Sequence, residues 1–156
     1  MNTPRIYTDT SVIGGCLDPE FRVASERLFD SFRSGQSIVV ISDLTLQELL
    51  GAPEDVRRLL TTVPHDAIEL IALTPDVDEL AEQYIARGVV REQDRADARH
   101  IAAATIHMVD VLVSWNFKHI VSLPRIRGYN SVNMLLGYKI LEIRTPAEIF
   151  SHDEEV

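Results

Sequence analysis

Three acidic residues in separate parts of the sequence are of the kind that holds a divalent cation in an enzyme. Asp9 belongs to a short β-branched run near the start of the chain, and Glu48 and Asp97 lie in segments with helical patterns. Mg²⁺ and Mn²⁺ prefer carboxylate and water oxygens as ligands. A cation held by the three acids would offset their mutual repulsion, activate a water molecule and stabilise charge on a phosphate. Because acids are common, their spacing alone is a weak indication of such a site.

Each of these acids also has an ordinary structural interpretation. Asp9 at the end of a strand could pair with an arginine, since an ionised carboxylate is costly to bury alone. Glu48 could complete a helix capping box with Thr45, and Asp97 could be a polar residue on a helix surface. Asp94 fits a helix N-cap as well as it fits a metal ligand.

The segments that would position these acids alternate between strand and helix patterns. Strands are expected over residues 5–13, 37–41, 67–73, 110–115 and 139–143. Helices are expected over residues 18–35, 42–50, 53–60, 75–87, 94–108 and 146–150, with a loop and helix interrupted by Gly128 over 123–136. Such alternation is typical of a mostly parallel sheet with helices on both faces. Ligand sites in such sheets lie beyond the carboxyl ends of the strands, where we expect Asp9 and Ser114.

The composition is that of a soluble globular protein. The chain has 156 residues, of which 46% are hydrophobic and 25% are charged, and this favours one domain over residues 1–156 with a short acidic tail from about residue 151. No apolar run is long enough to cross a membrane, and the first residues lack the layout of a signal peptide. The single cysteine, Cys16, excludes an internal disulfide and fits a reducing compartment. We therefore expect a cytoplasmic protein.

The charge is distributed unevenly along the chain. A net charge of -9 argues against a general nucleic-acid binder. Residues 117–144, however, contain five basic residues and one acidic residue, a net charge of +4. This basic segment is a candidate surface for phosphate groups, and ordinary solvated surface is the alternative interpretation.

Four segments, taken in order, resemble the signature blocks of PIN domains. They read YTDTSVI at 7–13, SDLTLQEL at 42–49, DARHIAAA at 97–104 and VLVSWNFKHI at 111–120. Each block alone is a weak signal, but the four in this order and spacing cover nearly the whole chain. The resemblance implies a three-layer α/β/α sandwich with a central, mostly parallel sheet. It also implies metal-dependent cleavage of RNA, as in VapC-type toxins of toxin–antitoxin pairs.

The resemblance implies roles for individual residues as well. The acids of the family fall on Asp9, Glu48 and Asp97, which would bind Mg²⁺ or Mn²⁺, with Glu48 binding the metal or orienting the attacking water. The fourth block departs from the family pattern, because many members carry an acid where this chain has Asn116 or, a few residues on, His119. We therefore expect a catalytic set in which Asn116 supplies a neutral carbonyl or holds a metal-bound water.

The remaining expectations concern supporting residues and partners. The residues expected to support the metal site are Thr10 and Ser11, either of which would orient Asp9, and Ser114 beside the metal's water molecules. The residues expected to contact RNA phosphates are Lys118, Arg125 and Arg127. A small antitoxin protein and a second copy of the chain are the expected protein partners, and no membrane contact is expected. The alternative is a non-catalytic PIN-fold protein that binds nucleic acid or a partner. Asn116 and the net charge favour that alternative, and the three acids oppose it.

Overall fold

The computed structural model describes residues 3–150, so the acidic tail expected from about residue 151 lies outside the described residues. Five parallel strands form one sheet in the order β3-β2-β1-β4-β5. The strands are β1 (Arg5–Thr8), β2 (Ile38–Ser42), β3 (Ile68–Ile71), β4 (Val111–Val113) and β5 (Ile143–Arg144). The longer helices are α2 (Arg22–Arg33), α5 (Pro75–Ala86), α6 (Arg95–Ile106) and α7 (Leu123–Leu135). Shorter helices are α1 (Thr10–Gly15), α3 (Asp43–Leu50), α4 (Glu54–Arg57) and α8 (Pro146–Ile149), with 3₁₀ turns η1 (Arg58–Thr62), η2 (His65–Ala67) and η3 (Glu92–Asp94).

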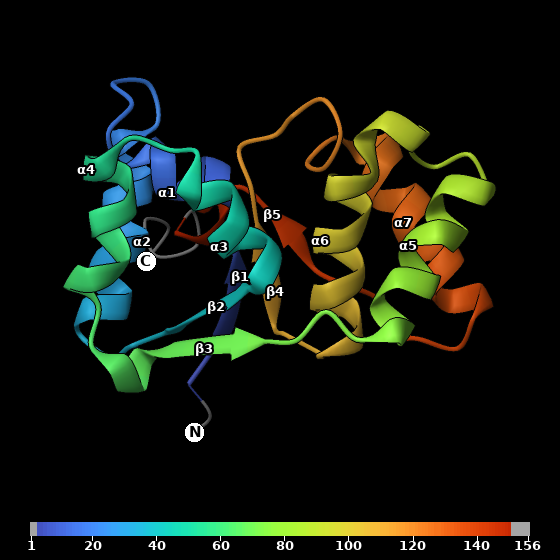
Figure 1. Ribbon diagram of the computed structural model, residues 1–156, viewed down its shortest axis with the longest axis horizontal. Helices are drawn as coiled ribbons and strands as arrows, with labels where there is room; N and C mark the ends of the chain where they lie inside the picture. The colour runs from blue at the N-terminus through green and yellow to red at the C-terminus, as the bar shows by residue number, and fades with distance from the viewer. Residues whose placement is uncertain (1–2, 151–156) are drawn as a thin grey trace.

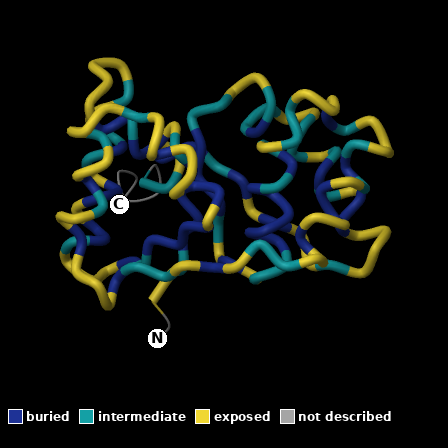
Figure 2. The backbone as a smooth tube through the Cα atoms, in the orientation of Figure 1, coloured by how far each residue is buried: buried dark blue, intermediate teal, exposed yellow. Residues whose placement is uncertain are grey.

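The helices cover both faces of the sheet, with α1 to α4 on one side and α5 to α7 on the other (Figure 1). Alternate residues of a strand point to opposite faces, and β1 shows this directly. Ile6 packs with Phe29 and Phe32 of α2, whereas Tyr7 packs in the cluster that holds Tyr84 and Ile101. Buried residues therefore lie on both sides of the sheet, and exposed residues are concentrated in the outer turns (Figure 2). The expected three-layer α/β/α sandwich is confirmed, and its sheet is entirely parallel.

The order of the strands places a crevice at a definite point of the sheet. From β1 the chain moves outward through β2 to β3, then returns to the other side of β1 for β4 and β5. The strand order thus reverses between β1 and β4, and ligand sites in open parallel sheets form beyond the carboxyl ends of strands at such a point. The residues that follow these two strands are Asp9 and Ser114.

Several expected elements differ from the structure: the helix expected over 18–35 begins only at Arg22, and that over 53–60 divides into α4 and η1. The strand expected over residues 5–13 ends at Thr8, because Asp9 caps a new helix by accepting a hydrogen bond from the Val12 N–H at 3.2 Å. Helix α7 runs without a break through Gly128, where a Cβ would lie 2.9 Å from Cγ1 of Val89, so the glycine permits close packing rather than ending the helix. The last strand is only Ile143–Arg144.

Within residues 3–150, no helix combines the length and the apolar character needed to cross a membrane.

Candidate active site

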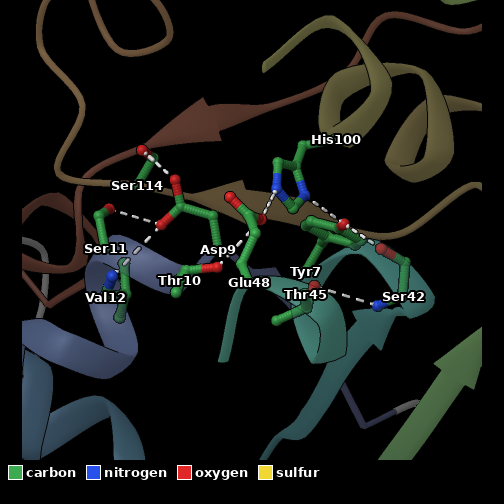
Figure 3. A network of polar contacts seen from close by, with 10 residues as sticks. All are labelled: Tyr7, Asp9, Thr10, Ser11, Val12, Ser42, Thr45, Glu48, His100 and Ser114. Atoms are coloured by element: carbon green, nitrogen blue, oxygen red, sulfur yellow. Dashed lines mark hydrogen bonds and ion pairs between the residues drawn. The ribbon is translucent and has the colours of Figure 1, made fainter. Parts of the chain in front are cut away.

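Asp9 lies at the reversal of the strand order, with a side chain that is buried and held by neutral donors. The hydroxyl of Ser11 donates to Oδ1 at 2.6 Å, and the hydroxyl of Ser114 donates to Oδ2 at 2.5 Å (Figure 3). The residue is 5% exposed, and among residues 3–150 no arginine pairs with it, so the arginine interpretation is wrong. Burial raises the pKa of Asp9, and the two serine hydrogen bonds act in the opposite direction. A cation beside this carboxylate would compensate its burial.

Glu48 reaches the same region from helix α3. Its Oε1 accepts hydrogen bonds from Thr10 Oγ1 at 3.1 Å and from His100 Nε2 at 2.5 Å (Figure 3). Thr10 therefore orients Glu48, whereas Ser11 orients Asp9. The capping box of α3 is formed by Ser42 and Thr45, so the interpretation of Glu48 as a capping residue is wrong. Partial burial acts to raise the pKa of Glu48, but the hydrogen bond and charge of His100 outweigh it and the pKa is lowered.

His100 links Glu48 to the interior through a chain of buried hydrogen bonds. Its other ring nitrogen, Nδ1, lies 2.6 Å from the hydroxyl of Tyr7, which lies 2.8 Å from Oγ of Ser42 (Figure 3). Both ring nitrogens of His100 therefore have a hydrogen-bond partner, Glu48 at Nε2 and the Tyr7 hydroxyl at Nδ1. Burial raises the pKa of Tyr7 to about 12, which keeps its proton in place.

The sequence analysis did not assign a role to His100. The signal that could have found it is local, because His100 is the polar residue three positions after Asp97, within an otherwise apolar helix face. Residues three apart lie on the same side of a helix. The partner of the imidazole, Glu48, is 52 residues away in the sequence and could not be inferred from that spacing.

Asp97 lies in the first turn of α6, half-buried, and its side chain makes no hydrogen bond to any other described residue. Burial raises the pKa of Asp97, electrostatic interactions with His119 and His100 lower it, and those with Asp94 and Asp9 raise it further. Asp9 thus contributes to the pKa of Asp97, and His100 acts on the pKa of both acids. Ligand atoms of Asp94, Asp97 and His119 also lie within 4.8 Å of one another.

Solved structures of similar fold are found among toxin–antitoxin proteins. VapC20 of Mycobacterium tuberculosis, described as a toxin that cleaves the sarcin–ricin loop, is 19% identical with a TM-score of 0.55, covering 73% of this chain and 92% of that one. FitAcB of Neisseria gonorrhoeae is 17% identical with a TM-score of 0.57, covering 90% and 97%. VapBC2 of Rickettsia felis, bound to a promoter DNA fragment, is 12% identical with a TM-score of 0.54, covering 90% and 98%.

This chain has the PIN-like fold. No protein-family model matches its sequence, and no curated protein sequence is significantly similar to it. At identities below 20% the similarity to the solved structures establishes the fold, and the chemistry must be argued from the side chains.

The fourth block of the PIN-like fold is arranged differently from the expectation. The side-chain oxygen of Asn116 accepts hydrogen bonds from the backbone N–H groups of Lys118 at 3.2 Å and His119 at 2.9 Å. Both lone pairs of that oxygen are then used to hold the turn. The turn places Nε2 of His119 3.7 Å from Oδ1 of Asp94, and leaves Nδ1 of His119 buried without a hydrogen-bond partner among the described residues. The structure thus gives Asn116 a task in shaping the loop.

The residues expected to contact RNA also differ among themselves. Lys118 and Arg127 are exposed, whereas Arg125 is half-buried and donates from Nη1 to the carbonyl oxygen of Val89. Lys118 and Arg127 therefore remain available for phosphate groups, and the guanidinium of Arg125 is engaged within the protein.

The residues around Asp9 fit a hard divalent cation. Asp9 is a buried carboxylate whose hydrogen bonds within residues 3–150 come from neutral donors, and Asp97 is a half-buried carboxylate without a hydrogen bond to another described residue. Buried polar groups almost always have partners, so two poorly compensated carboxylates in one region are typical of a cation site. Oxygen ligands of this kind suit Mg²⁺ or Mn²⁺.

Proposed function

We propose that this protein is a metal-dependent endoribonuclease that cleaves RNA phosphodiester bonds with Mg²⁺ or Mn²⁺. The observation that carries the proposal is the buried Asp9 carboxylate at the reversal of the strand order, whose hydrogen bonds within residues 3–150 come from hydroxyl and amide donors. Asp97 acts on it electrostatically, and Glu48 is held in the same region by Thr10 and His100. This set of oxygen donors suits hydrolysis assisted by a hard cation.

Each side chain has a distinct task in the proposed reaction. Asp9 and Asp97 would hold the cation, which when bound would supply positive charge that acidifies a water molecule and neutralises the phosphate. Glu48, with Oε1 fixed by hydrogen bonds from His100 and Thr10, would take the proton of the attacking water on its second oxygen. The hydroxide oxygen would bond to phosphorus as the bond to the ribose oxygen breaks, and the leaving ribose oxygen would take up a proton from solvent. Lys118 and Arg127 attract the phosphates of the strand.

We also propose that the protein acts as the toxin of a toxin–antitoxin pair, with a small antitoxin as its partner. Support comes from the similar structures, because one is described as a toxin–antitoxin complex from Klebsiella pneumoniae, with 18% identity and a TM-score of 0.55. A second is a toxin that cleaves the sarcin–ricin loop. Co-expression with a protein encoded immediately upstream tests the pairing, and a stable complex that blocks RNA cleavage is the expected result.

The test of the activity is a cleavage assay on purified protein with defined RNA oligonucleotides in Mg²⁺, Mn²⁺ or EDTA. Internal cleavage in either metal and none in EDTA is expected. A non-catalytic PIN-fold protein that binds RNA or a partner is the second candidate, favoured by the engaged carbonyl of Asn116 and the net charge of -9. RNA binding without cleavage at saturating metal would support that candidate and reject the enzyme.

A further inference from the structure

A cluster of three aromatic rings lies beside the candidate active site. Phe21 stacks on Trp115 with ring centroids 4.4 Å apart and an interplanar angle of 21°. Phe117 is tilted against both, with its centroid 6.4 Å from that of Phe21 and 6.2 Å from that of Trp115. Phe117 is 53% exposed, so the cluster presents one aromatic ring to solvent. What distinguishes Phe117 from the other exposed apolar residues is that its ring rests on two further aromatic rings.

The indole of Trp115 holds the cluster in a fixed position. Its Nε1–H donates to Oγ of Ser25 at 2.8 Å, and its backbone N–H donates to Oγ of Ser11 at 2.9 Å. Helix α1 has a glycine where the indole lies against it, because a Cβ at Gly15 would be 2.8 Å from Nε1. The sequence thus provides two hydroxyls and a gap that lock the indole in place, and the exposed ring rests on this support.

The aromatic cluster and the Asp9 carboxylate are connected through hydrogen bonds of Ser11 and through the adjacent residues Ser114 and Trp115. Ser11 accepts from the Trp115 backbone and donates to Asp9, while Ser114, the residue before Trp115, donates to the other oxygen of Asp9. Phe117 follows Ser114 by three positions, a span of at most about 10 Å even when fully extended. The exposed ring is therefore within reach of a nucleotide whose phosphate is bound near Asp9.

The net charge of -9 limits the affinity for RNA that phosphate contacts alone can supply. Affinity for RNA usually comes from phosphate contacts, and a chain with a net charge of -9 gains little from them beyond local residues such as Lys118. Stacking on an aromatic ring does not depend on charge, and every base has a face that stacks. Proteins that bind single strands combine a cation with an aromatic platform, as Lys118 and Phe117 do side by side here.

We propose that Phe117, supported by Trp115 and Phe21, binds an unpaired nucleobase next to the phosphate that is cleaved. This inference rests on the proposed ribonuclease function and adds to it the residue that holds the base beside the cleaved phosphate. A base within a duplex is stacked on its neighbours and does not reach the ring. Recognition of a loop or a single strand therefore follows from the ring.

Binding of short RNA oligonucleotides to the inactive Asp9→Asn variant tests the inference. The bases near the expected cleavage site are replaced one at a time by 2-aminopurine, whose fluorescence reports stacking. In this background, Phe117→Leu keeps an apolar side chain but removes the aromatic face, and Phe117→Tyr keeps the face. Phe117→Leu is expected to weaken binding about 10-fold, equivalent to about 1.4 kcal/mol, while Phe117→Tyr binds as Phe117 does.

Matched RNAs separate stacking from general contact. The base whose 2-aminopurine signal changes between Phe117 and Phe117→Leu is then removed from the RNA. Its removal should weaken binding to Asp9→Asn protein that retains Phe117 and leave binding to the variant that also carries Phe117→Leu unchanged. Equal binding by Phe117 and Phe117→Leu would overturn the inference, and so would a duplex that binds as tightly as the single strand. Loss of antitoxin binding or of a dimer in Phe117→Leu, with RNA binding intact, would also overturn it by assigning the ring to a protein interface.

The two proposals fail in different ways. If the wild-type protein cleaves no RNA at saturating metal, the ribonuclease function is rejected together with the platform that rests on it. If the wild type cleaves and Phe117→Leu cleaves single strands at the same rate, only the platform is rejected. Because Phe117 is more than half exposed, its replacement should leave the melting temperature within a few degrees of the wild type, which a thermal scan verifies.

Discussion

Nε2 of His100 lies 2.5 Å from Oε1 of Glu48, although 52 residues separate the two in the sequence. The imidazole is almost fully buried, and its other nitrogen lies 2.6 Å from the hydroxyl of Tyr7, whose proton is retained because burial raises the pKa of Tyr7 to about 12. The hydrogen bond to Tyr7 thereby fixes the orientation of the ring, with Nε2 facing Glu48. One carboxylate of the candidate site thus takes its orientation from the interior of the sheet.

The first prediction concerns this chain of hydrogen bonds. Tyr7→Phe removes the hydroxyl that is hydrogen-bonded to Nδ1 of His100 and keeps the aromatic ring in the core, so the imidazole is free to rotate and Glu48 loses its fixed orientation. We expect kcat for RNA cleavage to fall about 10- to 100-fold with little change in KM. His100→Gln, which still has a donor for Glu48, should retain more activity than His100→Ala.

The matched control is Tyr84→Phe. It also removes a buried hydroxyl from the same core cluster, but this hydroxyl donates to Asn133 and makes no hydrogen bond to His100 or Glu48. A loss of stability with unchanged kcat is expected for Tyr84→Phe. If the two variants lose activity equally, the effect of Tyr7→Phe is a general loss of packing and His100 does not position Glu48.

The second prediction concerns Asp9→Asn. The amide has nearly the shape of the carboxylate but lacks the charge that holds a cation, so RNA cleavage should fall below detection in excess Mg²⁺ or Mn²⁺. The fold should be kept, because Ser11 and Ser114 are hydroxyls that rotate to suit an amide. Cleavage at the wild-type rate, measured under the same conditions, would exclude Asp9 from the reaction.

The same substitution should make the metal-free protein more stable at neutral pH. Burial raises the pKa of Asp9 in the folded state above the value of about 3.9 for an unfolded chain. Between these two values the folded state binds more protons, so the free energy of unfolding falls as pH rises through this window. The wild type should therefore lose stability above about pH 4, and Asp9→Asn should lose less.

Urea unfolding in EDTA from pH 3 to pH 8 measures this difference. Asp97 also destabilises the fold as pH rises, since burial raises its pKa. Glu48 acts in the opposite direction: its pKa is lowered in the folded state, so its contribution to the stability of the protein is lost as pH falls. Replacing EDTA by Mg²⁺ should stabilise the wild type and leave Asp9→Asn unchanged. Parallel stability curves for the two proteins would show that Asp9 is not strained by burial.

The third prediction separates the basic residues of the 117–144 segment. Lys118→Ala and Arg127→Ala should weaken RNA binding and reduce the slope of log affinity against log salt by about 0.7 for each phosphate that the variant no longer binds. Arg125→Ala should instead lower the melting temperature, because Arg125 donates to the Val89 carbonyl. A steeper loss of RNA affinity in Arg125→Ala than in the other two variants would reverse this assignment.

The fourth prediction concerns the packing of α7. Gly128→Ala adds a Cβ 2.9 Å from Cγ1 of Val89, so it should destabilise the fold by about 1–3 kcal/mol in urea unfolding. Gly14→Ala is the control, since a Cβ there meets nothing within 4 Å in helix α1 and should stabilise by about 0.5–1 kcal/mol. Val89→Ala should rescue Gly128→Ala. Equal stability of Gly128→Ala and Gly14→Ala would contradict the packing.

Much of this architecture could be predicted from the sequence because strand and helix patterns alternate cleanly. The run of Thr8 to Ile13 was misleading, since its β-branched and hydroxyl residues suit a strand and a capped helix equally. Only the long-range hydrogen bond from Ser114 to Asp9, together with the cap at Val12, shows that the chain turns at this point. The pairing of His100 with Glu48 depends on the same tertiary packing and leaves no local pattern.

The fifth prediction compares Asn116 with His119. The oxygen of Asn116 already accepts two backbone N–H groups, so in Asn116→Asp one carboxylate oxygen stays engaged in the turn and only the second is new. His119 lies with Asp94 and Asp97, and His119→Asp would place a hard oxygen ligand in that group. His119→Asp should therefore lower the Mg²⁺ concentration for half-maximal binding several-fold more than Asn116→Asp does.

Calorimetric titration of both variants with Mg²⁺ and Mn²⁺ measures this difference directly, and cleavage of one RNA oligonucleotide at each concentration relates it to activity. Mn²⁺ accepts a nitrogen ligand more readily than Mg²⁺ does, so His119→Ala should weaken Mn²⁺ binding more than Mg²⁺ binding. Asn116→Asp is the control for added negative charge, because Asn116 lies in the same turn as His119. A larger gain in Mg²⁺ affinity from Asn116→Asp than from His119→Asp would place Asn116 next to the cation and His119 outside its ligands.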